Sequence, residues 1–149
     1  MTDIQYLVDR LAINDLLAEY ADYIDSKQFD KLPEVFTEDA YIDYTAFGGS
    51  AGSVSDIITF LNNSMASFST THHMMGNSIV KIDGDTARVR TQCHNPMVIA
   101  GDEMPQHVIF LGLWYVDELK RTSEGWRIHR RHQDPCYAHN MPEDFVVNN

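Results

Sequence analysis

The sequence predicts an α+β fold in which helices near the N-terminus pack on one face of a curved antiparallel sheet. Two observations support this fold class. In the first half of the chain the apolar residues recur at helical spacing, whereas from His73 onward they alternate as in strands. Helices followed by a run of adjacent strands are typical of α+β domains. Curling of such a sheet leaves a cone-shaped cavity, which is a natural site for a small molecule.

The first expected element is a long helix from about Asp3 to Asp25. Thr2 and Gln5 have the spacing of a capping box, which marks the start of a helix. At about 100° per residue, its apolar side chains fall on two nearly opposite faces. The helix therefore either bends or contacts two partners, for example its own core and another subunit. One face carries Ile4, Leu7, Val8 and Leu11, and the other carries Ile13, Leu17, Tyr20 and Ile24.

The segment after this helix alternates between short helical and extended patterns. A short helix interrupted by Pro33 is expected over Phe29–Phe36, and a strand is expected over Ala40–Tyr44. After a glycine-rich loop, either Ser53 or Ser55 is expected to cap a second helix. The apolar face of that helix consists of Ile57, Ile58, Leu61 and Met65.

The C-terminal half is expected to form a meander of four strands. Asp83-Gly84 is a hairpin signal, and Ser123–Gly125 is a second turn. Pro96 is expected to stop strand pairing soon after His94, because proline cannot donate a hydrogen bond to a neighbouring strand. The four expected strands span residues 77–82, 86–94, 107–119 and 126–132.

Charge and length limit the classes of function. The 149-residue chain has the size of one domain, so a single domain over residues 1–149 is expected. Its formal net charge is −11, from 11 basic and 22 acidic residues. Nucleic acids and anionic membranes both attract clustered Lys and Arg, so binding to either is disfavoured.

The sequence also favours a cytoplasmic protein. No apolar run approaches the roughly 20 residues that span a bilayer. The start of the chain is polar and acidic, unlike a secretory signal. The two cysteines, Cys93 and Cys136, make no disulfide framework, so a reduced cytoplasmic setting is expected.

The most informative stretch for chemistry contains His73, which lies between a helical pattern and a strand pattern. Asp25 ends the first expected helix. A carboxylate on one ring nitrogen of a histidine holds one tautomer, leaves the other nitrogen free to accept a proton, and stabilises the imidazolium that forms. We therefore hypothesise that Asp25 and His73 are a catalytic pair. The alternative is a helix-terminal carboxylate in solvent and an unrelated loop histidine.

Other polar residues are candidates for the same pocket. Tyr44 shares a strand face with Ile42, so its hydroxyl needs a partner in the core and could polarise a carbonyl. A core tyrosine whose hydroxyl is satisfied by the protein is the alternative. The candidate substrate-binding residues are Tyr23, Asn77, His94, Arg130 and His132, for which structural roles are the alternative.

Alternation underlies three of these candidates. Asn77 lies four residues after His73, hence on the same strand face if the strand begins early. Arg130 and His132 alternate with Trp126 and Ile128 and are expected to face inward. An inward arginine needs a buried carboxylate partner or an anionic intermediate.

No metal or cofactor motif is present in the sequence. His72 and His73 are adjacent and would point to opposite faces of a strand, and His129 and His132 are three apart. Neither Cys-x-x-Cys nor His-Glu-x-x-His occurs. The glycines at 48–52 lack the spacing and the lysine of a phosphate-binding loop. We therefore expect neither a metal nor a cofactor.

Several segments together resemble a known superfamily. They are Tyr23-Ile24-Asp25, Ala40–Tyr44, Thr71-His72-His73 with Gly76-Asn77, Asp83-Gly84-Asp85, Trp114-Tyr115 and Gly125–Ile128. On these segments, nearly the whole chain resembles the SnoaL-like branch of the nuclear transport factor 2-like superfamily. Within that branch it is similar to scytalone dehydratase and hexachlorocyclohexane dehydrochlorinase.

The resemblance implies a cone-shaped, cystatin-like α+β barrel, often trimeric in these two relatives, in which an Asp and a His form a dyad. Asp25 and His73 match the dyad, whose histidine is the base, and Tyr44 matches a tyrosine that polarises substrate. Ile24 stands where scytalone dehydratase has a second tyrosine, and Ile109 and Leu111 replace polar contacts. These departures imply a larger or more apolar substrate.

The expected function is a cofactor-independent lyase or isomerase, similar to a dehydratase or dehydrochlorinase, that acts on a small, largely apolar carbonyl-containing or cyclic substrate. The expected assembly is a homo-oligomer, a trimer or a dimer. One alternative is a small-molecule-binding module with the same cavity and no chemistry. Another is a subunit resembling the small subunit of ring-hydroxylating dioxygenases.

Overall fold

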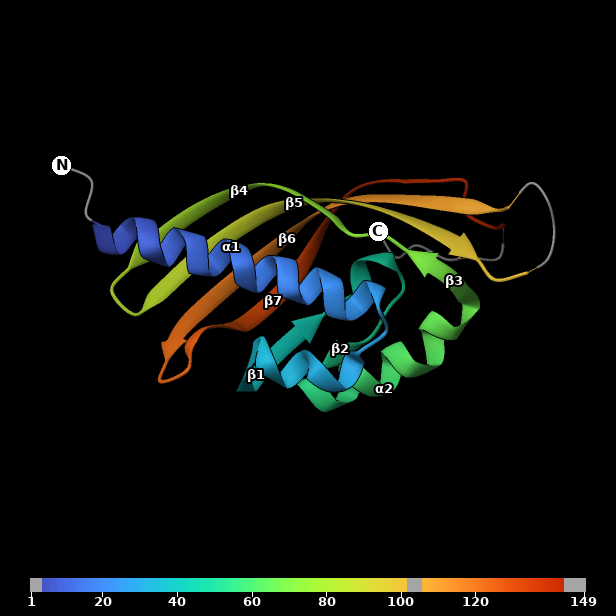
Figure 1. Ribbon diagram of the computed structural model, residues 1–149. Coiled ribbons are helices and arrows are strands. Elements are labelled where there is room, and N and C mark those ends of the chain that lie inside the picture. The colour runs from blue at the N-terminus through green and yellow to red at the C-terminus, as the bar shows by residue number, and fades with distance from the viewer. Residues whose placement is uncertain (1–3, 102–105, 144–149) are drawn as a thin grey trace.

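The described part of the chain, residues 4–101 and 106–143 of the computed structural model, folds into helices packed against one seven-stranded sheet (Figure 1). The helices are α1 (Ile4–Asp25), η1 (Phe29–Glu34), η2 (Thr45–Phe47), α2 (Val54–Ser64) and η3 (Met65–Ser67), where η marks a 3-10 helix. The strands are β1 (Phe36–Asp43), β2 (Ala51–Gly52), β3 (Phe68–Thr71), β4 (Met74–Asp83), β5 (Thr86–Ile99), β6 (Val108–Thr122) and β7 (Gly125–His139).

The sheet is curved, open and mixed. Its strand order is β2-β1-β7-β6-β5-β3, and β4 also pairs with β5. β1 runs parallel to β7, whereas the other paired strands are antiparallel. α1 lies across one face of the sheet, and α2 lies beyond β1 and β2 (Figure 1). The predicted fold class is confirmed, with the correction that the parallel β1–β7 pair makes the sheet mixed.

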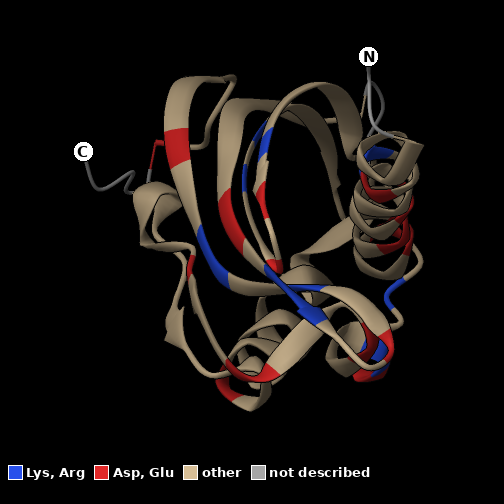
Figure 2. Cartoon of the chain, turned by 90° about the vertical axis from the view of Figure 1, so that its left-hand side faces the viewer, with Lys and Arg blue, Asp and Glu red and all other residues tan. Residues whose placement is uncertain are grey.

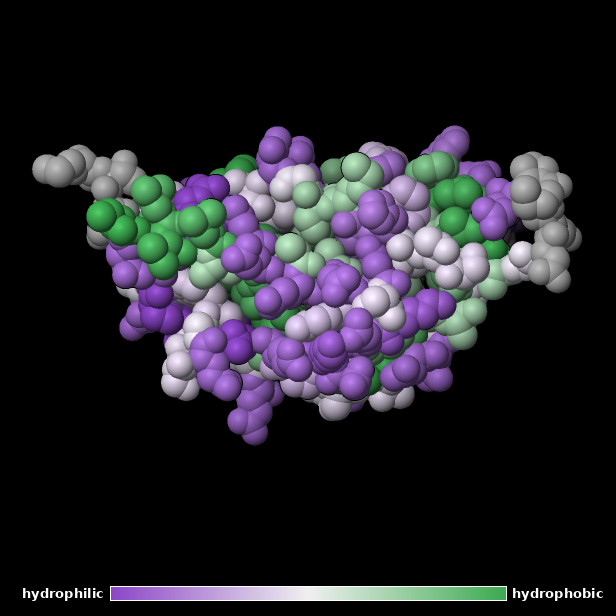
Figure 3. All heavy atoms as spheres, in the orientation of Figure 1, coloured by the Kyte–Doolittle hydropathy of each residue, from purple (hydrophilic) through white to green (hydrophobic). Residues whose placement is uncertain are grey.

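The two apolar faces predicted for α1 have different environments. Ile13, Leu17, Tyr20 and Ile24 are buried in the core. The other face, Ile4, Leu7, Val8 and Leu11, is 50–76% exposed and forms an apolar patch near the start of the helix (Figure 3). Contact of this patch with another subunit stays a prediction.

None of the described helices is both long and apolar enough to cross a membrane. The capping box at Thr2 lies outside the described residues.

Acidic residues recur along α1 (Figure 2), and one of them fixes the helix to the sheet. Asp9 is 4% exposed and accepts hydrogen bonds from Arg121 Nη1 (2.6 Å), Arg121 Nη2 (2.9 Å) and Trp126 Nε1 (3.1 Å). The bonds from Arg121, with those from Trp126 and Gln5, hold the pKa of Asp9 well below its usual range although burial opposes this. The network orients α1 over the β6–β7 hairpin.

The region between the first helix and the β half differs from the prediction mainly at its boundaries. β1 begins at Phe36 and ends at Asp43, so Tyr44 lies just beyond the strand. Ser53 caps α2 and forms a capping box with Asp56. The Asp56 N–H donates to Ser53 Oγ (3.3 Å), and the Ser53 N–H donates to Asp56 Oδ2 (2.9 Å). The short strands β2 and β3 were not predicted, because segments of two and four residues carry little periodicity.

Pro96 does not end β5, which continues to Ile99. Its carbonyl accepts a bond from the His72 N–H (3.0 Å), which shows that Pro96 turns its backbone polar groups toward the β3–β4 junction. In an antiparallel ladder one residue directs its N–H and C=O to the same neighbour. The missing N–H therefore falls at the junction, where pairing is already interrupted, and the ladder with β6 continues opposite Phe110.

β7 contains an irregularity that reverses its alternation. Leu119 pairs with Ile128 and Glu118 pairs with Arg130, so His129 is an extra residue in β7. Such a bulge shifts every following side chain to the other face of the strand. Arg131 is therefore buried, whereas Arg130 is exposed.

Candidate active site

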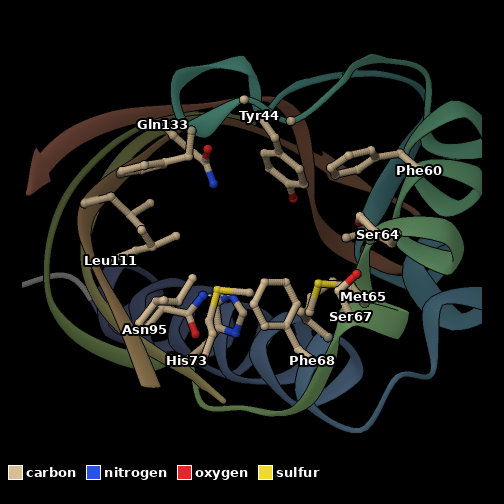
Figure 4. Close-up of a pocket in the computed structure, with 18 of the residues that line it drawn as sticks. Tyr44, Phe60, Ser64, Met65, Ser67, Phe68, His73, Asn95, Leu111 and Gln133 are labelled. Carbon is tan, nitrogen blue, oxygen red and sulfur yellow. Dashed lines mark hydrogen bonds between the residues drawn. The ribbon is translucent and has the colours of Figure 1, made fainter. Parts of the chain in front are cut away.

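A cavity of about 430 Å³ lies between the helices and the inner face of the sheet (Figure 4). Its wall is mostly aliphatic and aromatic, with polar groups at a few places. A largely apolar cavity with a few convergent polar groups is typical of a small-molecule site. The polar side chains that line it are Tyr20, Tyr44, Ser64, Ser67, His73, Asn95, Tyr115 and Gln133.

Asp25 is fixed at the C-terminal end of α1. Lys27 adopts a left-handed conformation (φ 56°) just after the helix and turns the chain away. The Asp25 carboxylate accepts hydrogen bonds from Thr71 Oγ1 (2.9 Å), the His73 backbone N–H (2.7 Å) and His73 Nδ1 (2.6 Å). The structure thus brings together the two residues, 48 positions apart, that the sequence hypothesis paired.

His73 directs its other ring nitrogen toward the cavity. Because an ionised carboxylate only accepts hydrogen bonds, Nδ1 must carry the proton shared with Asp25. Nε2 lies 3.2 Å from Asn95 Nδ2, an amide donor, which matches a neutral ring with an unprotonated Nε2. The side chain is only 6% exposed, and its ring lies against those of Tyr20 and Tyr115. This packing fixes both the tautomer and the orientation of the ring.

The hydrogen bonds to Asp25 make the stability of the protein depend on pH. Burial alone would raise the pKa of Asp25, but the bonds from His73 and Thr71 outweigh it and place the pKa below the ordinary value of 3.8. A carboxylate with a lowered folded-state pKa stabilises the fold above its unfolded-state pKa, and this contribution is lost as pH falls through the folded-state value.

We therefore expect Asp25→Asn to lower the free energy of unfolding by about 1–3 kcal/mol near neutral pH. This difference from wild type should begin to shrink as pH falls below about 4, the usual unfolded-state pKa of an Asp carboxyl, and should be lost once pH falls through the lower folded-state pKa. Urea unfolding across that pH range measures the difference. The matched control is Asp22→Asn, one turn earlier and exposed, which should have little effect. A difference that does not change with pH would argue against the assigned bonds.

Tyr44 forms a buried hydroxyl pair with Tyr20 at the cavity wall. The two hydroxyl oxygens are 2.6 Å apart, and the residues are 6% and 1% exposed, respectively. Burial raises the pKa of both hydroxyls well above the ordinary value, so both keep their protons. The Tyr44 hydroxyl points into the cavity from the wall opposite His73 (Figure 4). The pair can therefore donate a hydrogen bond to a ligand.

A buried cation lies behind this tyrosine pair. The Arg131 guanidinium carbon is 4.0 Å from the ring centroid of Tyr20 and 4.2 Å from that of Tyr115. Its Nε and Nη2 atoms each bind an Asp117 carboxylate oxygen at 2.7 Å, and both side chains are 0% exposed. Although burial disfavours the charge, Asp117 raises the pKa of Arg131 well above its ordinary value. The positive charge of Arg131 therefore packs against the rings of Tyr20 and Tyr115 and is balanced by Asp117.

None of the five residues predicted to bind substrate is among the residues that line this cavity. Tyr23 donates to Glu34 Oε2 (2.9 Å) at the surface. His132 is exposed and lies 3.5 Å from Asp134. The five residues predicted to bind substrate are Tyr23, Asn77, His94, Arg130 and His132.

Strand irregularities explain most of these differences. The bulge at His129 turns Arg130 and His132 outward. Asn77 lies within a register shift between Met75 and Ser78 and is exposed. Uninterrupted alternation does not hold across such bulges.

His94 lies on the outer face of β5, away from the cavity. Its Nδ1 is 2.5 Å from the Tyr137 hydroxyl, and its ring stacks on Phe110. Tyr137 reaches it across Gly112, where a Cβ atom would collide with the tyrosine ring. His94 therefore belongs to an aromatic cluster outside the cavity.

Some cavity residues were missed although the sequence contained a signal for them. Extending the alternation of Val89 and Thr91 through Cys93 reaches Asn95, which is 5% exposed and contacts His73. The assumed strand end at His94 concealed it. No three His, Cys, Asp or Glu side chains gather as metal ligands within residues 4–101 and 106–143.

The chain matches proteins of known family. A family model described as "SnoaL-like domain" matches residues 5–132. The uncharacterized protein Rv2910c of Mycobacterium tuberculosis is 47% identical over 141 residues, which cover 95% of each chain. The crystal structure of the Kfla4162 protein from Kribbella flavida has 30% identity and a TM-score of 0.81, covering 91% of this chain and 95% of that one.

Two further structures share the fold at lower identity. A putative scytalone dehydratase from Novosphingobium aromaticivorans has 17% identity and a TM-score of 0.81, covering 95% of this chain and 93% of that one. A hexachlorocyclohexane dehydrochlorinase, LinA-type3 from Novosphingobium barchaimii, has 16% identity and a TM-score of 0.80, covering 99% and 100%. The family match spans most of the sequence, and this chain belongs to the SnoaL-like domain family, with the fold of the nuclear transport factor 2-like superfamily.

Proposed function

We propose that this chain is a cofactor-independent lyase or isomerase in which His73 removes a proton from a neutral, largely apolar substrate. One observation carries the proposal: His73 Nδ1 is 2.6 Å from the Asp25 carboxylate while the ring lines the largely apolar cavity with its other nitrogen, Nε2. A base must have a free lone pair, a fixed tautomer and a group that stabilises its protonated form. Asp25 supplies the last two.

The reaction begins at a carbon next to a carbonyl or a leaving group. Its C–H bond breaks, the proton passes to Nε2 of His73, and the electron pair moves toward the carbonyl oxygen or expels the leaving group. Asp25 stabilises the imidazolium that forms. In an elimination His73 returns its proton to the leaving group, whereas in an isomerisation it returns the proton to a different carbon of the substrate.

The tyrosine pair supplies stabilisation of negative charge. When the Tyr20 hydroxyl donates its hydrogen bond to the Tyr44 oxygen, the Tyr44 hydroxyl can donate its own proton in a hydrogen bond to an oxyanion in the cavity. The Tyr20–Tyr44 pair holds this donor in a fixed position, and the apolar surroundings strengthen its hydrogen bond to the developing charge. Two structural neighbours, a putative scytalone dehydratase and a hexachlorocyclohexane dehydrochlorinase, have names that are consistent with chemistry starting from proton removal.

A binding module without chemistry is the second candidate, and Asn95 favours it. The Asn95 amide occupies the lone pair of His73 Nε2 at 3.2 Å. For His73 to act as a base, the amide must move aside or a substrate must displace it. If it does neither, the cavity holds a ligand without changing it.

Exchange of carbon-bound hydrogen for solvent deuterium separates the two candidates. We expect the protein to accelerate deuterium uptake at the acidic carbons of neutral ring ketones such as 2-tetralone, followed by NMR in D2O. Ligand-observed NMR on the same samples reports binding. Ketones that bind without accelerated exchange would support the binding module and refute the proposed enzyme.

A further inference from the structure

Gln133 places an amide on the cavity wall remote from His73. It lies on β7 opposite Tyr115, and it faces inward only because the bulge at His129 reverses the alternation of the strand. Figure 4 shows its side chain directed into the cavity on the same side as Tyr44, with His73 and Asn95 on the far side. The cavity therefore has two polar ends separated by apolar walls.

The side-chain oxygen of Gln133 is buried and has no hydrogen-bond partner among the described residues. Within residues 4–101 and 106–143, four buried side-chain polar atoms have no hydrogen-bond partner, and three of them belong to residues that line the cavity. These atoms are Ser64 Oγ, Asn95 Oδ1 and Gln133 Oε1. A buried acceptor without a donor is costly, and a ligand hydroxyl or N–H would satisfy it.

The lining also limits the charge of the ligand. The described lining residues include no Lys, Arg, Asp or Glu. Arg131, the nearby cation, is 0% exposed behind Tyr20 and is paired with Asp117. A carboxylate that entered the cavity would lose its hydration without gaining a cationic partner, which is strongly unfavourable.

We propose that the cavity selects neutral, apolar ring ligands that carry a hydroxyl group, and that Gln133 is the residue that recognises this hydroxyl. A hydroxyl both donates to an amide oxygen and accepts from an amide N–H, so it satisfies Gln133 in either orientation of the amide. Held there, the ligand extends across the cavity toward His73. The proposal extends the proposed function by naming a ligand class, but it concerns binding and does not require that His73 act as a base.

Four naphthalene derivatives of similar shape test the proposal in equilibrium titrations. They are 2-naphthol, 2-methoxynaphthalene, unsubstituted naphthalene and 2-naphthoate. We expect wild type to bind 2-naphthol about ten-fold more tightly than 2-methoxynaphthalene, as one hydrogen bond to a buried group predicts. 2-Naphthoate should bind more weakly than every neutral compound, because no cation meets its carboxylate.

Gln133→Leu, which has nearly the same size, should reduce the preference for 2-naphthol to about two-fold or less while binding of naphthalene is retained. The matched control is Gln92→Leu, the same substitution at an exposed position on β5, which should keep the preference. If Gln133→Leu folds poorly, Gln133→Met serves as a second variant and should reduce the preference for 2-naphthol in the same way.

Three results would overturn the proposal. They are a preference for 2-naphthol that survives both Gln133 substitutions, equal binding of 2-naphthoate and 2-naphthol, and failure of wild type to bind any of the four compounds. His73→Gln separates this proposal from the proposed function, because it should leave the preference for 2-naphthol intact while removing any proton exchange. Loss of exchange with retained preference would leave the Gln133 assignment standing.

Discussion

Replacing His73 with glutamine should slow deuterium exchange into bound ring ketones by about 10²–10⁴-fold, the usual contribution of a positioned general base. Glutamine keeps a polar side chain of similar reach, but its amide cannot accept a proton at neutral pH. Binding of the ketone should persist, because the apolar walls provide most of the contact area. The measurement is the exchange rate per bound ketone, followed by NMR.

The adjacent residue provides a matched control for this variant. His72 is exposed and lies outside the cavity lining, so His72→Gln should exchange at the wild-type rate. If His73→Gln exchanged at the wild-type rate, as His72→Gln should, the base would not be His73. Equal loss in both would instead point to a general disturbance of the segment between β3 and β4.

The largest expected effect on stability comes from Arg131→Met. Removing one partner of a buried ion pair leaves the other charge buried and uncompensated, which costs about 3–5 kcal/mol. Asp117 would be that residual charge, since both side chains are 0% exposed in wild type. The lost stacking on Tyr20 and Tyr115 adds to the effect. Urea unfolding measures the change.

Two comparisons make this prediction specific. Arg130→Met removes the neighbouring, exposed arginine and should change the free energy of unfolding by at most about 0.5 kcal/mol. Combining Arg131→Met with Asp117→Leu should recover part of the lost stability, because no unpaired charge remains. Arg130→Met and Arg131→Met of equal stability would show that Arg131 is not buried with Asp117.

Much of the fold and the central pair of the site could be predicted from the sequence, because their signals are local. The two faces of α1 follow from helical spacing, and the Ser53 cap follows from Asp56 three residues later. Asp25 ends a strong helical pattern and His73 precedes a strong strand pattern. Two element ends can therefore be located without knowledge of the strand register.

The remainder of the site depends on register, which single-sequence alternation does not determine. One extra residue at His129 exchanges Arg130 and His132 for Arg131 and Gln133 on the inner face. The parallel β1–β7 pair also has no local signal, because it joins segments from opposite ends of the chain. An inward arginine on this strand was expected correctly, but at the wrong position.

The position of the proton on the His73 ring decides whether His73 can act as a base toward a ligand in the cavity. The measurement is 15N NMR of the imidazole at a pH of about 8, where an ordinary histidine is neutral. We expect that Nδ1 carries the proton, hydrogen-bonded to Asp25, and that Nε2 is unprotonated, with this preference reduced in Asp25→Asn. A ring with its proton on Nε2 would have no lone pair directed into the cavity, and His73 could not be the base.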